Sequence, residues 1–484
     1  MRQTEYFSTR WALILAALGM AVGTGNIWRF PRIVAQNGGG SFLIPWIIFL
    51  FLWSIPLLII EFSMGKETRH GTVGAFGKFL GKKFTWMGAF VGFCTMAIMF
   101  YYSVVMGWCV KYFVTAVLAD SDIFQSEMYW SQFTRGLQPV FFHLISMAIG
   151  AFVIYKGVVQ GIEKANKILI PALFFLLIIA AVRALTLPGA VAGLNYLFKP
   201  ELAPLLDYKT WLAALSQSAW STGAGWGLIL TYAVYMKKQE DVVLNSFISG
   251  LGNNSASLLA AMVILPTIFA LLPYKDAMKA VSASNTGLTF IWIPKLFEQM
   301  PLGSAFMVVF FLALTFAAMS SLIAMIELAT RIFMDAGMKR HHAIFYVAVF
   351  GFLLGLPSAL SMAFFDNQDW VWGLGLIVSG MFFAFAAIKY GVDKLRTNIV
   401  NAEGCDLKAG KWFNVIVMFL IPIEFVALLA WWFWQAVTTF DPQGWWHPFR
   451  TLSLGTCILQ WGVTIVVFLI FNNRLYKKSV QVNS

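Results

Sequence analysis

Apolar residues fill most of this chain in long runs, and short polar segments separate the runs. A helix needs about 20 apolar residues to cross the hydrocarbon core of a bilayer. We find twelve such runs, centred near residues 22, 53, 102, 148, 174, 221, 258, 318, 351, 380, 425 and 464. The longest polar connections, roughly 119–138, 185–208, 274–303 and 392–411, are too short to enclose a core of their own. The pattern predicts an all-α membrane protein with twelve transmembrane helices in a single domain.

Two of these runs contain residues that interrupt a helix. The first carries glycine, asparagine, arginine and proline in its middle, over Gly19–Pro31. The sixth, Trp211–Tyr235, has the soft centre Ser221–Gly227. Unpaired backbone groups are costly in hydrocarbon, so a broken membrane helix persists only where protein or water covers the break. The freed carbonyl and amide groups can then bind something small, and we expect the binding site where the two breaks meet.

Because the breaks lie five runs apart, they suggest two five-helix halves, each opening with a broken helix. The first half covers about residues 9–184 and the second about 209–391. Two further helices, over about 412–474, follow them.

The composition supports the membrane assignment and gives an orientation. Hydrophobic residues make up 60% of the 484 residues and charged residues only 12%. Lysine and arginine gather in the connections on the side of the N-terminus, for example at Lys66, Lys82 and Lys394. This positive-inside bias predicts cytoplasmic termini and explains the net charge of +12 by topology and anionic lipid, without nucleic acid. The four cysteines show no metal-binding spacing, and we expect no structural disulfide.

The first-run motif Gly-Met-Ala-Val-Gly-Thr-Gly-Asn-Ile-Trp-Arg-Phe-Pro, followed by Asn37-Gly38-Gly39-Gly40, resembles the signature of the neurotransmitter:sodium symporter family. The glycine-rich sixth run, Ser320-Ser321 and Asp369 follow in the expected order, so the resemblance covers all twelve runs. It is closest to the bacterial amino-acid transporter branch with the leucine-transporter-type fold. The resemblance implies two inverted five-helix repeats with discontinuous helices 1 and 6, plus two C-terminal helices. It also implies sodium-coupled symport of an amino acid by alternating access.

The resemblance implies two sodium sites. The first consists of Ala21, Asn26, Ser221 and Asn253, with the carboxylate of the substrate as a further ligand. The second consists of Gly19, Val22, Ala317, Ser320 and Ser321. Sodium is a hard cation that prefers oxygen ligands, which an unwound helix supplies through its carbonyl groups. The alternative for Ser320 and Ser321 alone is that small hydroxyl residues let helices approach closely.

For the organic substrate, the resemblance points to an amino acid. Relatives that carry biogenic amines have aspartate at the position of Gly23, and glycine there leaves room for a substrate with its own carboxylate. The hydroxyl of Tyr102 and the amides at the break would meet that carboxylate. The implied substrate-binding residues are Met20, Ala21, Gly23, Thr24, Gly25, Ile98, Tyr102, Trp220, Ser221, Gly223, Trp226, Ser321 and Met325.

The large indole of Trp226 makes the pocket smaller and favours a small neutral amino acid. Gly223, which has no side chain, makes the pocket larger again. A second interpretation is that Trp220, Trp226 and Tyr102 form part of an aromatic cage for an N-methylated amino acid such as betaine or sarcosine.

Charges at lipid depth are functional by default because they are costly there. Arg29 and Asp369 match the family's outer gate, with Trp220 as the lid, although permanent helix–helix pairing is the alternative. Asp335 matches the inner-gate aspartate. The arginine expected near the N-terminus is missing, since Thr4 aligns with it, and Arg2 is a possible substitute.

Three buried glutamates complete the set of charges at lipid depth. Glu61 is expected to brace the break in the first run through hydrogen bonds to its backbone. Structural roles are expected for Glu327 and Glu424.

Chloride is a further candidate ligand. Ser257 stands where chloride-independent relatives carry a carboxylate and chloride-dependent relatives carry serine. The residues implied for chloride are Trp46, Gln217, Ser221, Asn253 and Ser257. The indole N–H of Trp46 would replace a tyrosine hydroxyl as a donor.

Three rivals remain at this stage: a channel, an intramembrane enzyme and a transport-inactive amino-acid sensor. The chain has no Gly-x-Ser-x-Gly or His-Glu-x-x-His motif, which argues against an enzyme. Short loops suggest, by resemblance, a bacterial inner-membrane protein. The partners expected are a small-molecule substrate and membrane lipid, and the oligomeric state stays open.

Overall fold

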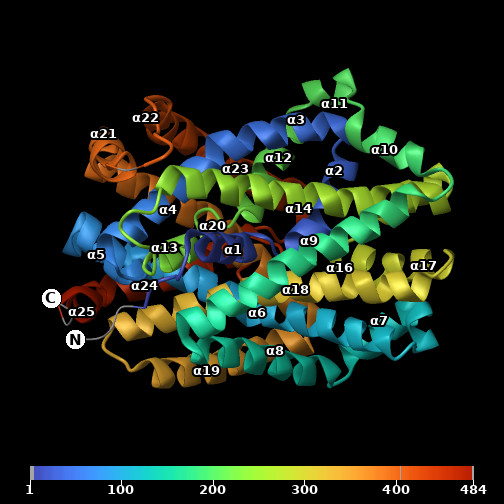
Figure 1. Cartoon of the computed structure of the whole chain (residues 1–484), viewed down its shortest axis with the longest axis horizontal. Helices are drawn as coiled ribbons and strands as arrows, with labels where there is room; N and C mark the ends of the chain where they lie inside the picture. Colours follow the sequence, from blue (N-terminus) through green and yellow to red (C-terminus); the bar gives the residue numbers. More distant parts are fainter. Residues whose placement is uncertain (1–4, 404, 482–484) are drawn as a thin grey trace.

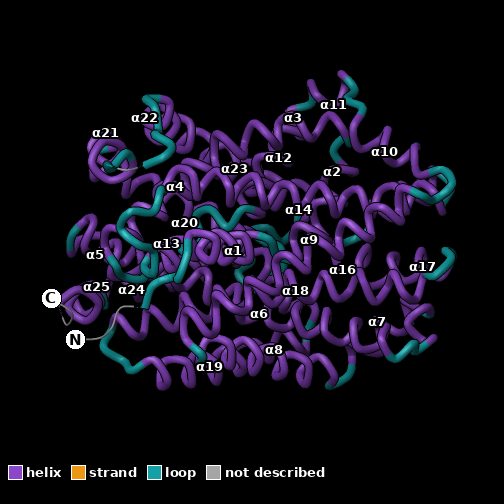
Figure 2. The backbone as a smooth tube through the Cα atoms, in the orientation of Figure 1, coloured by secondary structure: helices purple, strands orange, loops and turns teal. Residues whose placement is uncertain are grey.

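The computed structural model describes residues 5–403 and 405–481, and every regular element in that range is a helix. Long helices run side by side along the long axis of the molecule (Figure 1), joined by short loops (Figure 2). Nine of them are long and apolar enough to cross a membrane. They are Gly40–Thr68 (α3, η2 and α4), Lys82–Val117 (η3 and α6), Gln138–Tyr155 (α8), Val158–Leu185 (η5 and α9), Val242–Leu271 (α14), Gly303–Asp335 (α18), Arg340–Leu360 (α19), Met362–Tyr390 (α20) and Trp412–Phe440 (α22, η8, α23 and η9).

Two further spans are bent pairs of helices. Arg10–Ala21 (α1) and Gly25–Gln36 (η1 and α2) meet at 53°, and Leu454–Ile470 (α24) and Asn472–Gln481 (α25 and η10) meet at 64°. Together with the interrupted pair Tyr208–Ser221 (α12) and Leu228–Ala233 (α13), they complete twelve spans. The fold class expected from the sequence is confirmed.

Most of the polar connections are not plain loops but contain short helices, which the sequence did not predict. These are α5 (Thr72–Leu80), α7 (Ser126–Arg135), α10 (Ala190–Phe198), α11 (Leu202–Leu206), α15 (Tyr274–Val281), α16 (Asn285–Gly287), α17 (Ile293–Glu298) and α21 (Val392–Leu395). In Figure 1, α5, α21 and α25 lie at one end of the molecule and α7, α11 and α17 at the other. We call these ends the α25 side and the α7 side.

The break in the first span follows from competition for its backbone groups. Helix α1 begins at the N-cap Thr9, whose side chain accepts from the Ala12 amide, and it ends at Ala21. Beyond it, the Gly23 amide donates to Asn26 Oδ1 (2.9 Å) and the Thr24 amide to the Tyr102 hydroxyl (3.1 Å). In a continuous helix these amides would bond the carbonyls of residues 19 and 20. The break thus frees carbonyl oxygens in the centre of the molecule.

The break in the sixth span depends on glycine. Gly223, Gly225 and Gly227 have φ angles of +70°, +87° and +77°, a region that side chains with a Cβ rarely adopt. The carboxylate of Glu61 accepts from the amides of Gly225 (2.6 Å) and Leu230 (3.3 Å). The expectation that Glu61 braces the first break was therefore wrong. Helix α4, which carries Glu61, packs directly against α13.

Helix α1 occupies the middle of the bundle (Figure 1). It packs against α9, α14 and α18, and its residues from Ala16 to Val22 are all buried. The broken first span is thereby covered on its sides by protein, as its freed backbone groups require.

Candidate substrate and ion sites

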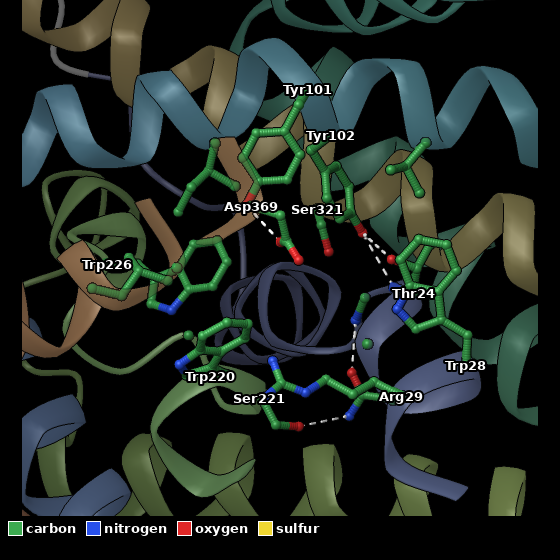
Figure 3. Close-up of a pocket in the computed structure, with 18 of the residues that line it drawn as sticks. Thr24, Trp28, Arg29, Tyr101, Tyr102, Trp220, Ser221, Trp226, Ser321 and Asp369 are labelled. Carbon is green, nitrogen blue, oxygen red and sulfur yellow. Dashed lines mark hydrogen bonds between the residues drawn. The ribbon is translucent and has the colours of Figure 1, made fainter. Parts of the chain in front are cut away.

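A cavity of about 200 Å³ lies between the two broken spans and the helices α6, α18 and α20. Figure 3 shows side chains from these elements converging on it. The structure brings every residue that the resemblance assigned to the substrate to this one cavity. They are Met20, Ala21, Gly23, Thr24, Gly25, Ile98, Tyr102, Trp220, Ser221, Gly223, Trp226, Ser321 and Met325.

Sequence reasoning missed other lining residues. The cavity continues toward the α7 side and is lined there by Ser284, Thr286, Phe365 and Asp366. Asp366 was open to prediction, because it precedes Asp369 by one helical turn. Ser284 and Thr286 lie in a polar connection, and nothing in the sequence around them indicates that they line a cavity.

The floor of the cavity is crowded around Gly23. A Cβ at this position would lie 2.9 Å from Ser321 Oγ and 3.0 Å from the Tyr102 hydroxyl. That hydroxyl also lies near the Thr24 side chain (3.3 Å). Any side chain at position 23 would displace these hydroxyl groups, so the glycine keeps both hydroxyls at the cavity.

The space left by the missing side chain of Gly223 is already filled by Met20. A Cβ at Gly223 would lie 2.5 Å from the sulfur of Met20. Trp226 closes another wall, and its backbone carbonyl accepts from Thr95 Oγ1 (2.6 Å). The cavity therefore stays narrow despite the glycines in its lining.

The indole of Trp220 packs between two flat groups, the guanidinium of Arg29 and the indole of Trp432. The guanidinium carbon of Arg29 lies 3.7 Å from one ring centroid, and Trp432 stacks with the indole at 6.2 Å and 20°. Among residues 5–403 and 405–481, Arg29 forms no ion pair, and Asp369 instead accepts from the Tyr101 hydroxyl (3.1 Å). Arg29 and Asp369 both line the cavity without closing it.

The residues implied for the first sodium site form one polar cluster. The amide nitrogen of Asn26 lies 2.8 Å from Asn253 Oδ1 and 3.3 Å from Ser221 Oγ. In the other orientation of the Asn253 amide, its nitrogen takes the place of Oδ1 beside Asn26 and donates to the carbonyl of Ala21 at 3.0 Å. All four residues are buried. The cluster holds several oxygen atoms and no fixed carboxylate, which suits a monovalent cation that shares the site with a substrate carboxylate.

The residues implied for the second site also converge. Ser320 Oγ lies 3.0 Å from the carbonyl of Ala317 and 3.5 Å from that of Val22. Ser321 Oγ lies 3.4 Å from the carbonyl of Met20, one residue from Gly19. The freed carbonyls of the first span thus face the hydroxyls of α18. Such oxygen sets fit sodium.

The chloride candidates are only partly brought together. Ser257 Oγ lies 2.8 Å from the Asn26 side-chain nitrogen. Trp46 Nε1 and Gln217 Oε1 are buried without a hydrogen-bond partner in the described part of the chain. The indole N–H of Trp46 and the hydroxyl proton of Ser257 suit an anion, whereas the unpaired atom of Gln217 is an acceptor.

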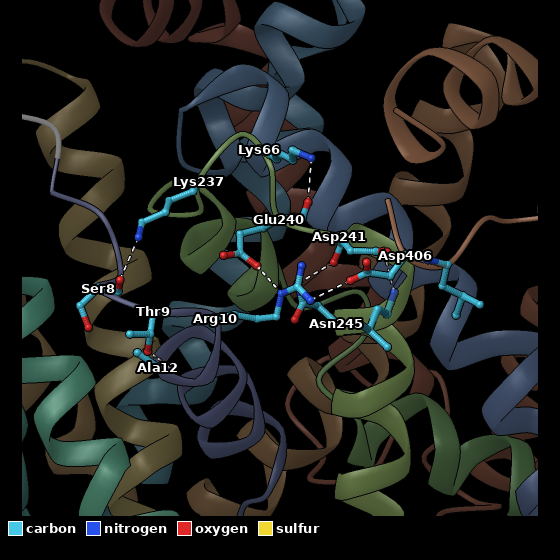
Figure 4. A network of polar contacts seen from close by, with 12 residues as sticks. Ser8, Thr9, Arg10, Ala12, Lys66, Lys237, Glu240, Asp241, Asn245 and Asp406 are labelled. Carbon is cyan, nitrogen blue, oxygen red and sulfur yellow. Dashed lines mark hydrogen bonds and ion pairs between the residues drawn. The ribbon is translucent and has the colours of Figure 1, made fainter. Parts of the chain in front are cut away.

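On the α25 side, ion pairs connect the start of α1 to distant loops. Arg10 pairs with Glu240 (3.0 Å) and Asp406 (2.8 Å), and Lys237 donates to the carbonyl of Ser8 (2.8 Å). Figure 4 shows Arg10 between the two carboxylates. Phe7, beside Ser8, is buried.

Asp335, which the resemblance assigns to the inner gate, has partners close to it in the structure. Asp335 pairs with Arg331 (2.9 Å) and accepts from the Gly71 amide (2.6 Å). Arg2 and Thr4 lie outside the described residues.

Glu327 is fully buried and holds both Arg340 (2.6 Å) and the Tyr235 hydroxyl, whereas Glu424 Oε2 is buried without a partner in residues 5–403 and 405–481.

Comparison with known proteins identifies the class. The chain matches the model of the sodium:neurotransmitter symporter family over residues 4–139 and 127–477. It is 32% identical over 447 residues to MJ1319 of Methanocaldococcus jannaschii, an uncharacterized sodium-dependent transporter, covering 88% of this chain and 90% of that one. It is 29% identical over 309 residues to the sodium-dependent neutral amino acid transporter B(0)AT2 of Bos taurus, covering 54% of this chain and 40% of that one.

The same likeness appears in three dimensions. The structure of MhsT in complex with L-phenylalanine superposes with a TM-score of 0.77 at 29% identity, covering 88% of this chain and 99% of that chain. The molecule is thus a sodium-dependent membrane transporter, not an enzyme. It belongs to the sodium:neurotransmitter symporter family.

Proposed function

We propose that this protein carries a small neutral amino acid across the membrane together with sodium, by alternating access to the central cavity. One observation carries the proposal. The carbonyl of Ala21 lies 3.0 Å from the side-chain amide of Asn253, which also contacts Ser221, and the carbonyls of Val22 and Met20 lie 3.5 Å and 3.4 Å from the hydroxyls of Ser320 and Ser321. Both oxygen sets border the cavity that would hold the organic substrate.

The substrate is a small amino acid because the cavity is narrow and offers its polar groups at one end. The Tyr102 hydroxyl accepts from the Thr24 amide and can donate its own proton to a carboxylate in the space beside Gly23. Met20 fills the space above Gly223, and Trp226 closes a wall, which leaves little room for a long side chain. That two of the matched proteins are a neutral amino acid transporter and a complex with L-phenylalanine agrees with this class.

Two sodium ions would bind as co-substrates, one at each oxygen set. The first would be held by Ala21, Asn26, Ser221 and Asn253, and the second by Gly19, Val22, Ala317, Ser320 and Ser321. Chloride would bind near Ser257 and stimulate transport. The unpartnered Trp46 Nε1 supports this placement, and unchanged transport after gluconate replaces chloride would contradict it.

The protein would reside in a bacterial inner membrane with the α25 side facing the cytoplasm. Lys82, Lys83 and Lys394 are exposed on that side, as the positive-inside rule requires.

A substrate with an N-methylated ammonium group is the second candidate. Tyr102, Trp220 and Trp226 all line the cavity, and aromatic faces attract such cations by about 0.5–2 kcal/mol per ring. A transport-inactive sensor would keep the same cavity, and a measured flux separates it from a carrier.

The test is uptake into proteoliposomes under an inward sodium gradient, with radiolabelled glycine, alanine, proline, leucine and tryptophan in parallel. We expect accumulation of a small amino acid that needs sodium and is abolished by Ser321→Ala. Accumulation of betaine or sarcosine instead would favour the second candidate. Binding of an amino acid without flux would favour the sensor.

A further inference from the structure

A buried asparagine lies beside the first break without a known role. Asn166, in α9 (Lys164–Leu185), is fully buried. Its side-chain nitrogen donates to the carbonyl of Ile162 at 2.9 Å, which fixes the orientation of the amide. Its oxygen, Oδ1, is buried and has no hydrogen-bond partner within residues 5–403 and 405–481.

This oxygen points at the residue where the first helix begins to lose its hydrogen bonds. A Cβ on Gly19 would lie 2.0 Å from Asn166 Oδ1, so the approach is possible only because residue 19 is glycine. Gly19 is also the residue whose carbonyl loses its helical partner, since the Gly23 amide turns to Asn26. Helix α9 packs against both α1 and α18, which are the two helices that carry the second oxygen set.

An unpaired buried oxygen destabilises a protein unless something compensates it. A contact with the Cα–H group of Gly19 is a weak compensation and is the purely structural explanation. An amide oxygen is also a good ligand for a hard cation, and the oxygen atoms of the second set lie along the two spans against which α9 packs. A cation would satisfy Asn166 Oδ1 far better than a C–H group.

We propose that Asn166 is a further residue of the second sodium site and that its side-chain oxygen raises the affinity of that site for sodium. The proposal rests on the proposed function, because it assumes that a sodium ion binds between α1 and α18. Asn166 would make α9 a third wall of the site, so sodium binding would fasten α9 to the broken first span.

The experiment measures sodium binding to the purified full-length protein without measuring transport. Sodium chloride replaces choline chloride at constant ionic strength and pH 8, and Tm is followed against sodium concentration. A ligand that binds only the folded state raises Tm as its concentration passes Kd. For Asn166→Leu we expect the half-maximal sodium concentration to rise about tenfold, the change that follows from the loss of one hydrogen-bond-like contact to an ion.

Asn245→Leu is the matched control. Asn245 is buried in α14, its side-chain nitrogen also donates to the carbonyl four residues earlier, and its Oδ1 also lacks a partner in the described chain. It lies near Arg10 and Asp241 on the α25 side and not beside the break (Figure 4). We expect Asn245→Leu to leave the half-maximal sodium concentration unchanged.

A second variant keeps the proposal testable if Asn166→Leu does not fold. Asn166→Asp places a carboxylate at the same position and should lower the half-maximal sodium concentration. Three results would each overturn the proposal. The half-maximal sodium concentration could be the same in Asn166→Leu as in the unaltered protein, or it could rise as much in Asn245→Leu as in Asn166→Leu. It could also rise in Asn166→Asp. If the unaltered protein shows no response to sodium, the proposed function itself fails.

Discussion

The two ends of the central cavity differ in how their charges are used. On the α25 side, Arg10, Arg331 and Arg340 all hold carboxylates within 3.0 Å. On the α7 side, Arg29 and Asp369 line the same cavity, but Arg29 lies on the face of Trp220 and Asp369 binds Tyr101. The α25 side is held by ion pairs, of which those of Arg10 join distant elements, whereas the α7 side keeps its opposite charges apart.

This difference indicates that the central cavity of this structure opens toward the α7 side and is closed toward the α25 side. The cavity reaches Ser284 and Thr286 on the α7 side, whereas Phe7 and Tyr235 are buried on the α25 side. A transporter that alternates must exchange these two arrangements. The α25-side pairs would then stabilise this state, and the Arg29–Asp369 pair would stabilise the next one. The following predictions test that division, from the largest expected effect to the smallest.

The largest effect should come from the buried pair on the α25 side. Glu327 is fully buried and holds Arg340 through two hydrogen bonds. Arg340→Gln would leave an unpaired buried charge, which costs about 3–5 kcal/mol of unfolding free energy. Thermal unfolding of the purified protein measures the loss, seen as a lower Tm.

The matched control is the double variant Glu327→Gln with Arg340→Gln, which removes both charges and should recover most of the lost Tm. If the double variant is no more stable than Arg340→Gln, the pair does not act as an ion pair.

The second prediction concerns Arg10, which is 40% exposed at its side chain and pairs with Glu240 and Asp406. Arg10→Gln should lower stability by no more than about 1 kcal/mol, because water screens exposed pairs. It should nevertheless favour opening of the α25 side, since the pairs join α1 to two loops. Faster proteolysis of the 237–241 loop would report the opening, and an unchanged rate would contradict a latch role.

The third prediction concerns the aromatic stack behind Trp220, which we expect from the family resemblance to close the cavity as a lid. Trp432 packs against the face of Trp220, and such aromatic pairs contribute about 0.5–1.5 kcal/mol. If the stack holds the lid aside, Trp432→Ala should favour lid closure and raise the apparent affinity for substrate up to about tenfold. Trp434→Ala, on the same helix with its indole 63% exposed, is the control. A lower affinity in Trp432→Ala would show that the stack does not oppose closure.

The smallest effect should be a pH dependence on the α25 side. His70 lies between the second span and α5, and burial lowers its pKa below the ordinary value, against the opposing effect of nearby Asp335. The unfolded chain therefore binds a proton at His70 more readily than the folded one. This contribution to stability is complete above the ordinary histidine pKa of about 6.5 and declines as pH falls below it.

His70→Gln should flatten the fall of Tm between pH 7.5 and pH 5.5. The exposed His342 offers a control, because His342→Gln should leave the slope of Tm against pH unchanged. An unaltered slope in His70→Gln would remove His70 from the explanation.

Much of this architecture was predictable because long apolar runs and their glycine breaks are visible in the sequence. The motif around Gly19–Pro31 led to the cavity residues. Helix breaks and small hydroxyl residues can be recognised in the sequence without knowing how the helices pack. Glu61 was assigned to the wrong break, because a sequence does not say which of two nearby helices a buried carboxylate will face. The partners of Arg10 and the contact of Glu327 with Tyr235 were equally hidden, since they come from elements remote in sequence.

The central claim is that sodium controls which side of the cavity is reachable. We would place one cysteine on each side, Thr286→Cys in the cavity lining of the α7 side and Thr330→Cys in the buried face of α18, each with Cys405→Ala. A hydrophilic maleimide then measures the accessibility of each cysteine in purified protein. The account predicts that sodium speeds labelling at position 286 and slows it at position 330, and that potassium reverses both. Changes in the same direction at both positions, or no response to sodium, would contradict it.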